Sequence, residues 1–204
     1  MKKTKFIFLI IILILNFSCV KDQKKISKLT EKSLESQVLE AYEEGVEALE
    51  DGDVLYAAKK FNEAEILFPQ SEWAPNSALM AAYSYYLQDY YGDAIAELER
   101  FLEVYKKDKN LNYANYLMAV AYYEQIVDEK RDLNAIINAK KYFNIVIELS
   151  PNSEYAVDAK FKIDLINDIL ASKEMYIGRY YVDRKKWIPA INRFRTVLDE
   201  YETT

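Results

Sequence analysis

The chain has 204 residues, 51% of them hydrophobic and 14% aromatic, and its formal net charge of −6 argues against nucleic acid as a partner, because phosphate binding needs a basic face. It contains no His and 1 Cys, which excludes histidine-based catalysis, histidine metal ligands and intramolecular disulfides. With 4 Gly, 4 Pro and 18 Tyr, the composition favours long helices and a binding surface over an enzyme.

The N-terminus has the pattern of an export signal. Three lysines within Met1–Lys5 precede an unbroken apolar run, Phe6–Leu15, and the small residue Ser18 then precedes Cys19. The apolar run is shorter than the roughly twenty residues of a membrane span, so we predict a signal peptide over residues 1–18. The segment resembles a bacterial lipobox, which implies a covalent lipid on Cys19 as the anchor. A plain signal peptide with an incidental cysteine is the alternative.

The residues after the cysteine are polar and rich in lysine. They have no strong hydrophobic period, so we predict a lipidated flexible tether over residues 19–35. A first helix that starts near Ile26 is the alternative. The residue after Cys19 is Val20 and not the Asp that resembles an inner-membrane retention signal. We therefore expect sorting to the outer membrane. The chain would then face the periplasm and meet the membrane through its lipid alone.

The rest of the chain repeats a pattern of small residues. In four segments an alanine lies four residues before a bulky apolar residue: Ala57/Phe61, Ala94/Leu98, Ala139/Phe143 and Ala190/Phe194. Three of these alanines follow another small residue by twelve positions: Gly45, Ala82 and Gly178. Such spacing lets two successive helices cross closely, as in the tetratricopeptide pattern. We therefore predict an all-α fold, a right-handed superhelical solenoid of about four tetratricopeptide repeats, as one domain over residues 36–204.

Turn signals place the helices of this solenoid in pairs. We expect the pairs at 36–50/53–68, 72–88/91–105, 110–127/132–149 and 154–182/187–201. Pro69 and Pro151 each end a helix, and Ser71 and Ser153 are suitable N-caps for the next one. The third pair carries an insertion around Asp128–Asp132. The fourth pair opens with a long helix, because Ser153–Val182 contains no Pro.

The last part of the chain carries a more specific signal. Two runs, Gly178-Arg179-Tyr180-Tyr181 and Trp187-Ile188-Pro189-Ala190-Ile191-Asn192-Arg193-Phe194, closely resemble the BamD family, the tetratricopeptide lipoproteins of the outer-membrane β-barrel assembly (BAM) machinery. The resemblance covers the mature chain and is to the alphaproteobacterial form. It implies a non-enzymatic subunit that helps insert proteins into the outer membrane. It also implies three kinds of partner: a BamA-like barrel protein, other assembly-complex subunits and unfolded outer-membrane proteins. Family members usually carry five repeats, so we expect the C-terminal repeat to be missing.

Tyrosines converge on one face of the predicted solenoid. The first helices of repeats one to three place six of them in the concave groove: Tyr42, Tyr83, Tyr86, Tyr113, Tyr116 and Tyr123. Tyrosine offers a large contact area at low entropic cost and a hydroxyl for a main-chain partner. We predict that this groove binds an extended aromatic peptide, which the resemblance implies to be the C-terminal segment of an unfolded outer-membrane protein. The alternative is that these tyrosines only fill space between helices.

The fourth repeat is locally basic in an acidic chain. Its cations are Arg179, Arg184, Lys185, Lys186, Arg193 and Arg195. The resemblance implies a docking surface for the periplasmic domain of BamA, with Arg179 and Arg193 as its key residues; a solvated face is the alternative. Among the 33 acidic residues none forms a nucleophile or metal pattern, so we expect no catalytic, cofactor or metal site. A tetratricopeptide adaptor for cell-wall or division machinery would share the fold and is the competing function.

Overall fold

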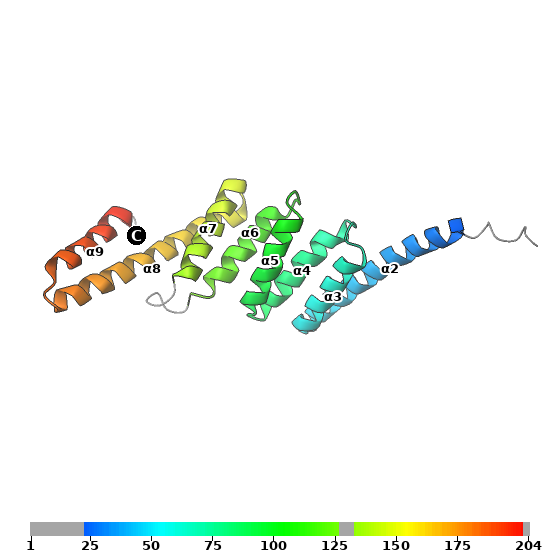
Figure 1. The fold of residues 1–204 in the computed structure, drawn as a ribbon, viewed down its shortest axis with the longest axis horizontal. Coiled ribbons are helices and arrows are strands. Elements are labelled where there is room, and N and C mark those ends of the chain that lie inside the picture. The colour runs from blue at the N-terminus through cyan, green and yellow to red at the C-terminus, as the bar shows by residue number, and fades with distance from the viewer. Residues whose placement is uncertain (1–22, 127–132, 202–204) are drawn as a thin grey trace, which may run out of the picture.

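The computed structural model describes residues 23–126 and 133–201, with side chains from Leu34 onward. Helices in this part of the chain follow one another along the long axis of an extended molecule (Figure 1). They form four successive pairs: α2 (Gln23–Glu50) with α3 (Val54–Leu67), α4 (Trp73–Leu87) with α5 (Tyr91–Val104), α6 (Leu111–Tyr123) with α7 (Asn134–Leu149), and α8 (Glu154–Asp183) with α9 (Trp187–Glu200). The described residues contain no strand, so the predicted all-α repeat fold is confirmed.

The N-terminal segment is where the structure differs from expectation. Helix α2 begins at Gln23, so residues 23–35, expected within the flexible tether, continue the first helix. Lys, Gln, Leu and Glu in this stretch are good helix formers, and a helix extends readily from a packed segment. The predicted signal peptide, Cys19 and the predicted insertion at 128–132 lie outside the described residues. Within the described ranges, no helix is both long and apolar enough to cross a membrane.

The repeated small residues lie where paired helices cross. A Cβ atom added to Gly45 of α2 would lie 2.8 Å from Cε1 of Phe61 in α3, and one added to Gly178 of α8 would overlap the ring of Phe194 in α9. The partner alanines are fully or almost fully buried, with Ala57 and Ala94 at 0% exposure. The tetratricopeptide spacing in the sequence therefore marks real close crossings, where a larger side chain would push the helices apart.

The turns within three pairs share one backbone conformation. Gly52 (φ 82°), Asp89 (φ 60°) and Lys185 (φ 59°) each stand five residues before the repeat alanine and have positive φ. In each turn the following amide donates a hydrogen bond back into the first helix, as from Asp53 to the Ala48 carbonyl at 2.8 Å. Only the first turn uses glycine, the residue that adopts this conformation without strain.

The core is built from three consecutive helices at a time. One buried cluster joins α4, α5 and α6 around Leu98, Phe101 and Met118, and the next joins α6, α7 and α8 around Phe143 and Ile166. No pair buries its apolar face alone, which is the physical logic of a solenoid. Helix α8 is long enough for two tasks: its first half packs on α6 and α7, and its last turns hold α9. Helix α9 contacts α8 alone among the described helices.

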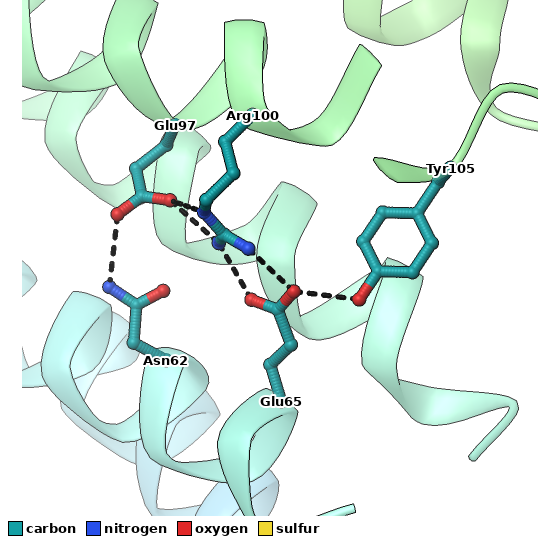
Figure 2. Close-up of polar contacts among 5 residues, drawn as sticks. All are labelled: Asn62, Glu65, Glu97, Arg100 and Tyr105. Atoms are coloured by element: carbon teal, nitrogen blue, oxygen red, sulfur yellow. Dashed lines mark hydrogen bonds and ion pairs between the residues drawn. The ribbon is translucent and has the colours of Figure 1, made fainter. Parts of the chain in front are cut away.

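A polar network ties the first pair to the second (Figure 2). Glu65 of α3, only 6% exposed, accepts hydrogen bonds from both terminal nitrogens of Arg100 in α5, each at 2.7 Å, and from the Tyr105 hydroxyl at 2.6 Å. Glu97 accepts from the other side of the guanidinium and also from the Asn62 amide at 3.3 Å. The hydrogen bond to Glu65 is the main cause of the raised pKa of Arg100. Bidentate geometry of this kind fixes the register between α3 and α5.

Candidate binding surfaces

Five of the six predicted groove tyrosines lie along the first helices of the second and third pairs. Tyr83, Tyr86 and Tyr113 border the α4–α5–α6 core, and Tyr86, Tyr116 and Tyr123 border the α6–α7–α8 core. Tyr86 touches both clusters, so the series is continuous from α4 to α8. All five side chains are half-buried. We call these five residues, together with Tyr155 of α8, the tyrosine face.

Each member of the tyrosine face packs on another aromatic ring. Tyr83 stacks on Tyr86 with ring centroids 6.5 Å apart, and Tyr155 lies 4.9 Å from Tyr116 and 5.6 Å from Tyr113. Tyr123 meets the buried Phe143 edge-on at 6.2 Å. These tyrosines therefore contribute to packing between helices and keep part of each ring at the surface. That they bind a peptide stays a prediction.

Tyr42 has a separate environment at the start of the solenoid. Its ring lies 5.2 Å from Phe61 and 5.1 Å from Trp73, so it packs on α3 and on the first residue of α4. The contact repeats further along the chain. Trp73 and Tyr155 occupy equivalent positions after the prolines Pro69 and Pro151, and each covers a tyrosine of the preceding first helix.

Sequence reasoning missed Trp73 and Tyr155 as members of this surface. Their side chains are 42% and 38% exposed, which is more than any predicted groove tyrosine. The repeat Pro-x-Ser-Glu-aromatic-Ala, shared by residues 69–74 and 151–156, was the signal that could have found them. The serine in each copy accepts a hydrogen bond from the alanine amide, Ser71 from Ala74 at 3.2 Å and Ser153 from Ala156 at 3.1 Å. This local turn places the aromatic residue in the first turn of the next helix.

Burial raises the pKa of several hydroxyl groups of the tyrosine face. It raises the pKa of Tyr113 to about 12 and is the largest cause of the raised pKa of Tyr86 and Tyr116. The Tyr116 hydroxyl also donates a 2.7 Å hydrogen bond to Asp158 of α8. A surface of aromatic rings with neutral hydroxyl groups suits apolar contact and main-chain hydrogen bonding, and no nucleophile or general base is arranged among these residues.

The predicted docking residues lie on the last helix pair. Arg193 of α9 donates two hydrogen bonds to Glu174 of α8, at 2.9 and 3.2 Å, and its side chain remains 44% exposed. It lines a shallow hollow of about 250 Å³ with Tyr181, Ile188, Pro189, Asn192 and Thr196. Arg193 thus both joins the two helices and faces solvent.

Arg179 lines a different and larger hollow. It is exposed and borders a space of about 570 Å³ between α8 and α9, together with Asp168, Ala171, Ser172, Met175, Tyr176, Val197, Leu198 and Tyr201. Arg179 and Arg193 are therefore on one helix pair but in separate hollows.

The neighbouring Arg184 stacks on the Tyr180 ring at 3.6 Å from its centroid. Trp187, Ile188 and Leu198 expose 59%, 75% and 68% of their side chains beside these cations. Exposed apolar groups next to cations are typical of protein interfaces.

Comparison with known protein families identifies the chain. A family model described as YfiO, outer membrane lipoprotein, matches residues 34–204, which run from within α2 past the end of α9. The chain belongs to this family. The resemblance to the BamD family seen in the C-terminal runs is confirmed over most of the chain.

Curated relatives carry the name outer membrane protein assembly factor BamD. The protein of Caulobacter vibrioides is 41% identical over 163 residues, which are 80% of this chain and 53% of the relative. The protein of Rickettsia prowazekii is 38% identical over 178 residues, 87% of this chain and 71% of the relative. A Neisseria meningitidis relative is 30% identical over 98% of this chain and 79% of its own length. The chain thus spans about half the length of the Caulobacter relative.

A solved structure supports the fold. The first tetratricopeptide domain of Spaghetti (RPAP3), solved with an HSP90 peptide, superposes with a TM-score of 0.52 at 18% identity. The match covers 67% of this chain and 94% of that domain. At this level of identity the likeness concerns the fold alone. It confirms the tetratricopeptide architecture that the spacing of small residues in this chain indicates.

Proposed function

We propose that the protein is a non-enzymatic subunit of the outer-membrane β-barrel assembly complex. The observation that carries this proposal is family membership over residues 34–204, with relatives named as BamD assembly factors at up to 41% identity. The protein acts by holding other proteins, because its surfaces offer aromatic rings, hydroxyl groups and cations. In this proposal Cys19 carries the lipid that anchors the chain in the outer membrane, and the helical domain faces the periplasm.

The tyrosine face is the proposed binding site for unfolded outer-membrane proteins. Its rings run from α4 across α6 to α8 and keep part of their surface exposed. An extended segment with aromatic side chains would stack on these rings, and the protonated hydroxyl groups would donate to its main chain. Trp73, at the start of α4, adds another exposed ring, which packs on Tyr42.

The last helix pair is the proposed docking site for a BamA-like barrel subunit. Arg193 lines one hollow with the exposed Ile188, and Arg179 lines the other with the exposed Leu198. An apolar centre supplies most of the binding free energy, and rim charges mainly steer association. Docking should therefore weaken as salt rises, whereas peptide binding on the largely uncharged tyrosine rings should change less.

Two sets of variants test the proposed division of labour. Tyr83→Ala combined with Tyr116→Ala should lose peptide binding and keep barrel-subunit capture, and Arg193→Glu should do the reverse. Binding is measured by fluorescence anisotropy with an aromatic peptide and by pull-down of the purified barrel subunit. Tyr56→Ala, an exposed tyrosine on α3, is the matched control and should leave both activities intact.

Folding controls keep this test decisive. Tyr83→Phe with Tyr116→Phe retains the ring packing and removes only the hydroxyl groups, so circular dichroism should match the parent chain. If both alanine and glutamate variants lose both activities while folded, the division between the two surfaces is wrong. If purification captures cell-wall or division proteins and no barrel subunit, the adaptor function replaces the assembly function.

A further inference from the structure

Three carboxylates from separate elements border the tyrosine face. Asp158 of α8 accepts the 2.7 Å hydrogen bond from Tyr116. Asp89, in the turn after α4, accepts a 2.7 Å hydrogen bond from Tyr91, whose ring lies 5.9 Å from Tyr86. Glu124 directly follows Tyr123 at the end of α6 and is exposed. The edge of the aromatic surface is therefore negative near α4, α6 and α8 alike.

Carboxylates contribute to the raised pKa of two tyrosines of the face. After burial, Glu124 and then Asp89 contribute to the raised pKa of Tyr86, and Glu124 and Asp158 contribute to that of Tyr123. The raised pKa of Tyr113 is caused by burial and by neighbouring tyrosines. The contributing ionic groups on these tyrosines are all carboxylates, which lower the electrostatic potential over the rings.

The face already holds one cation on a ring. Lys162 of α8 places its ammonium nitrogen 4.7 Å from the centroid of the Tyr123 ring. The negative face of an aromatic ring attracts such a group, and nearby carboxylates strengthen the attraction. Lys162 thus shows within this chain how a cation beside an aromatic surface is accommodated. Tyr155, 38% exposed and 4.9 Å from Tyr116, offers another ring close to the Asp158 carboxylate.

From this geometry we propose that the tyrosine face selects aromatic segments that carry lysine or arginine beside the aromatic residues and rejects segments with acidic neighbours. The aromatic side chains of the ligand would stack on the rings of Tyr83, Tyr116 and Tyr155. Its cations would lie at the edge, within reach of Glu124, Asp89 and Asp158. This inference rests on the proposed function, because it presupposes that the face binds peptides, and it adds the chemical class of the segment bound.

Three synthetic peptides test the selection on the full chain purified in detergent. All share one aromatic spacing and are acetylated and amidated, so terminal charges are absent; the residues beside the aromatics are asparagine, lysine or glutamate. The lysine peptide should bind about two- to fivefold more tightly per charge contact than the asparagine peptide, and the glutamate peptide more weakly by a similar factor. The differences should shrink as salt rises above physiological ionic strength.

One substitution assigns the effect to the proposed edge. Glu124→Gln should reduce the preference for the lysine peptide, and Glu103→Gln, which removes an exposed carboxylate from α5, should leave it unchanged. Equal affinities for all three peptides, or a preference for the glutamate peptide, would overturn the inference and leave the proposed peptide-binding function standing. Failure of every peptide to bind the folded chain would overturn that function and the inference with it.

Discussion

Arg100 and Glu65 form two parallel hydrogen bonds, each 2.7 Å long, across the junction between the first and second helix pairs. The Glu65 side chain is 8% exposed, whereas that of Arg100 is 40% exposed. Removing the cation therefore leaves a nearly buried carboxylate with Tyr105 as its remaining partner in this network. An unpaired buried charge is costly, so loss of this cation should destabilise the junction.

Arg100→Met should consequently lower the free energy of unfolding by about 2–3 kcal/mol, less than for a fully buried pair because the guanidinium is partly solvated. The free energy of unfolding of Arg100→Lys should lie between those of the parent chain and Arg100→Met, since the ammonium group keeps the charge but loses the bidentate geometry. Chemical denaturation followed by circular dichroism measures both. Lys60→Met is the control and should cost less, because the carboxylates that lose this cation, Glu44 and Glu63, are far more exposed than Glu65. Equal losses for Lys60→Met and Arg100→Met would show that the network adds nothing special.

A second prediction concerns the close helix crossings at Gly45 and Gly178. Gly178→Ala and Gly45→Ala should each destabilise the fold by about 1–3 kcal/mol, because the new methyl group would meet the ring of Phe194 or Phe61. Gly92→Ala in α5 is the matched control: nothing lies within 4 Å of its added Cβ, so the higher helix propensity of alanine should make it neutral or slightly stabilising. Thermal unfolding of the three variants decides. A Gly178→Ala midpoint equal to that of Gly92→Ala would contradict the crossing geometry.

Alkaline pH should weaken the fold through the tyrosine face. Burial raises the pKa of Tyr113 to about 12, whereas an unfolded tyrosine titrates near about 10. Between these values the folded chain binds more protons than the unfolded chain. The contribution is fully present below pH of about 10, and the free energy of unfolding falls as pH rises toward about 12. Tyr86 and Tyr116 act in the same direction, because burial raises their pKa as well.

Tyr113→Phe isolates this effect. The phenylalanine cannot ionise, so the stability of the variant relative to the parent chain should rise from pH 9 to pH 12, starting from whatever difference exists at neutral pH. Denaturant unfolding across the pH series measures the two curves, and tyrosinate absorbance of the folded chain reports the titration directly. Parallel curves for the parent and variant would contradict the assignment.

The sequence predicted the elements better than the contacts between them. Alanine and glycine spacing located the helix pairs because a close crossing requires a small residue where one helix meets a bulky side chain of the other, as Gly178 and Phe194 show. The positive φ of Asp89 and Lys185 could not be predicted in this way, since neither turn uses the glycine that normally marks this conformation. The Glu65–Arg100 pair was also missed, because periodicity does not tell which polar side chains of α3 and α5 meet.

The candidate surfaces were predicted with the same limits. Helical position placed five tyrosines on a continuous series, but Tyr155 was omitted because only the first three repeats were considered. The sequence showed the basic cluster but not how its members separate in space. Arg179 and Arg193 line separate hollows, and Arg193 is paired with Glu174. Which cation faces a partner depends on such pairings, and these follow only from the packing of α9 on α8.

The last prediction concerns Arg193. Its ion pair with Glu174 can be separated from its proposed contact with the barrel subunit by exchanging the two charges. Arg193→Glu alone should destabilise the α8–α9 pair, since it places two carboxylates where Arg193 now bonds Glu174 at 2.9 Å. The double variant Arg193→Glu with Glu174→Arg restores an ion pair and should recover most of the thermal stability. It should not recover capture of the barrel subunit, because the exposed part of residue 193 now presents the opposite charge to the partner. Arg179→Glu should weaken capture without altering stability, as Arg179 is exposed. Recovery of capture by the double variant would show instead that Arg193 serves docking only by holding α9 against α8.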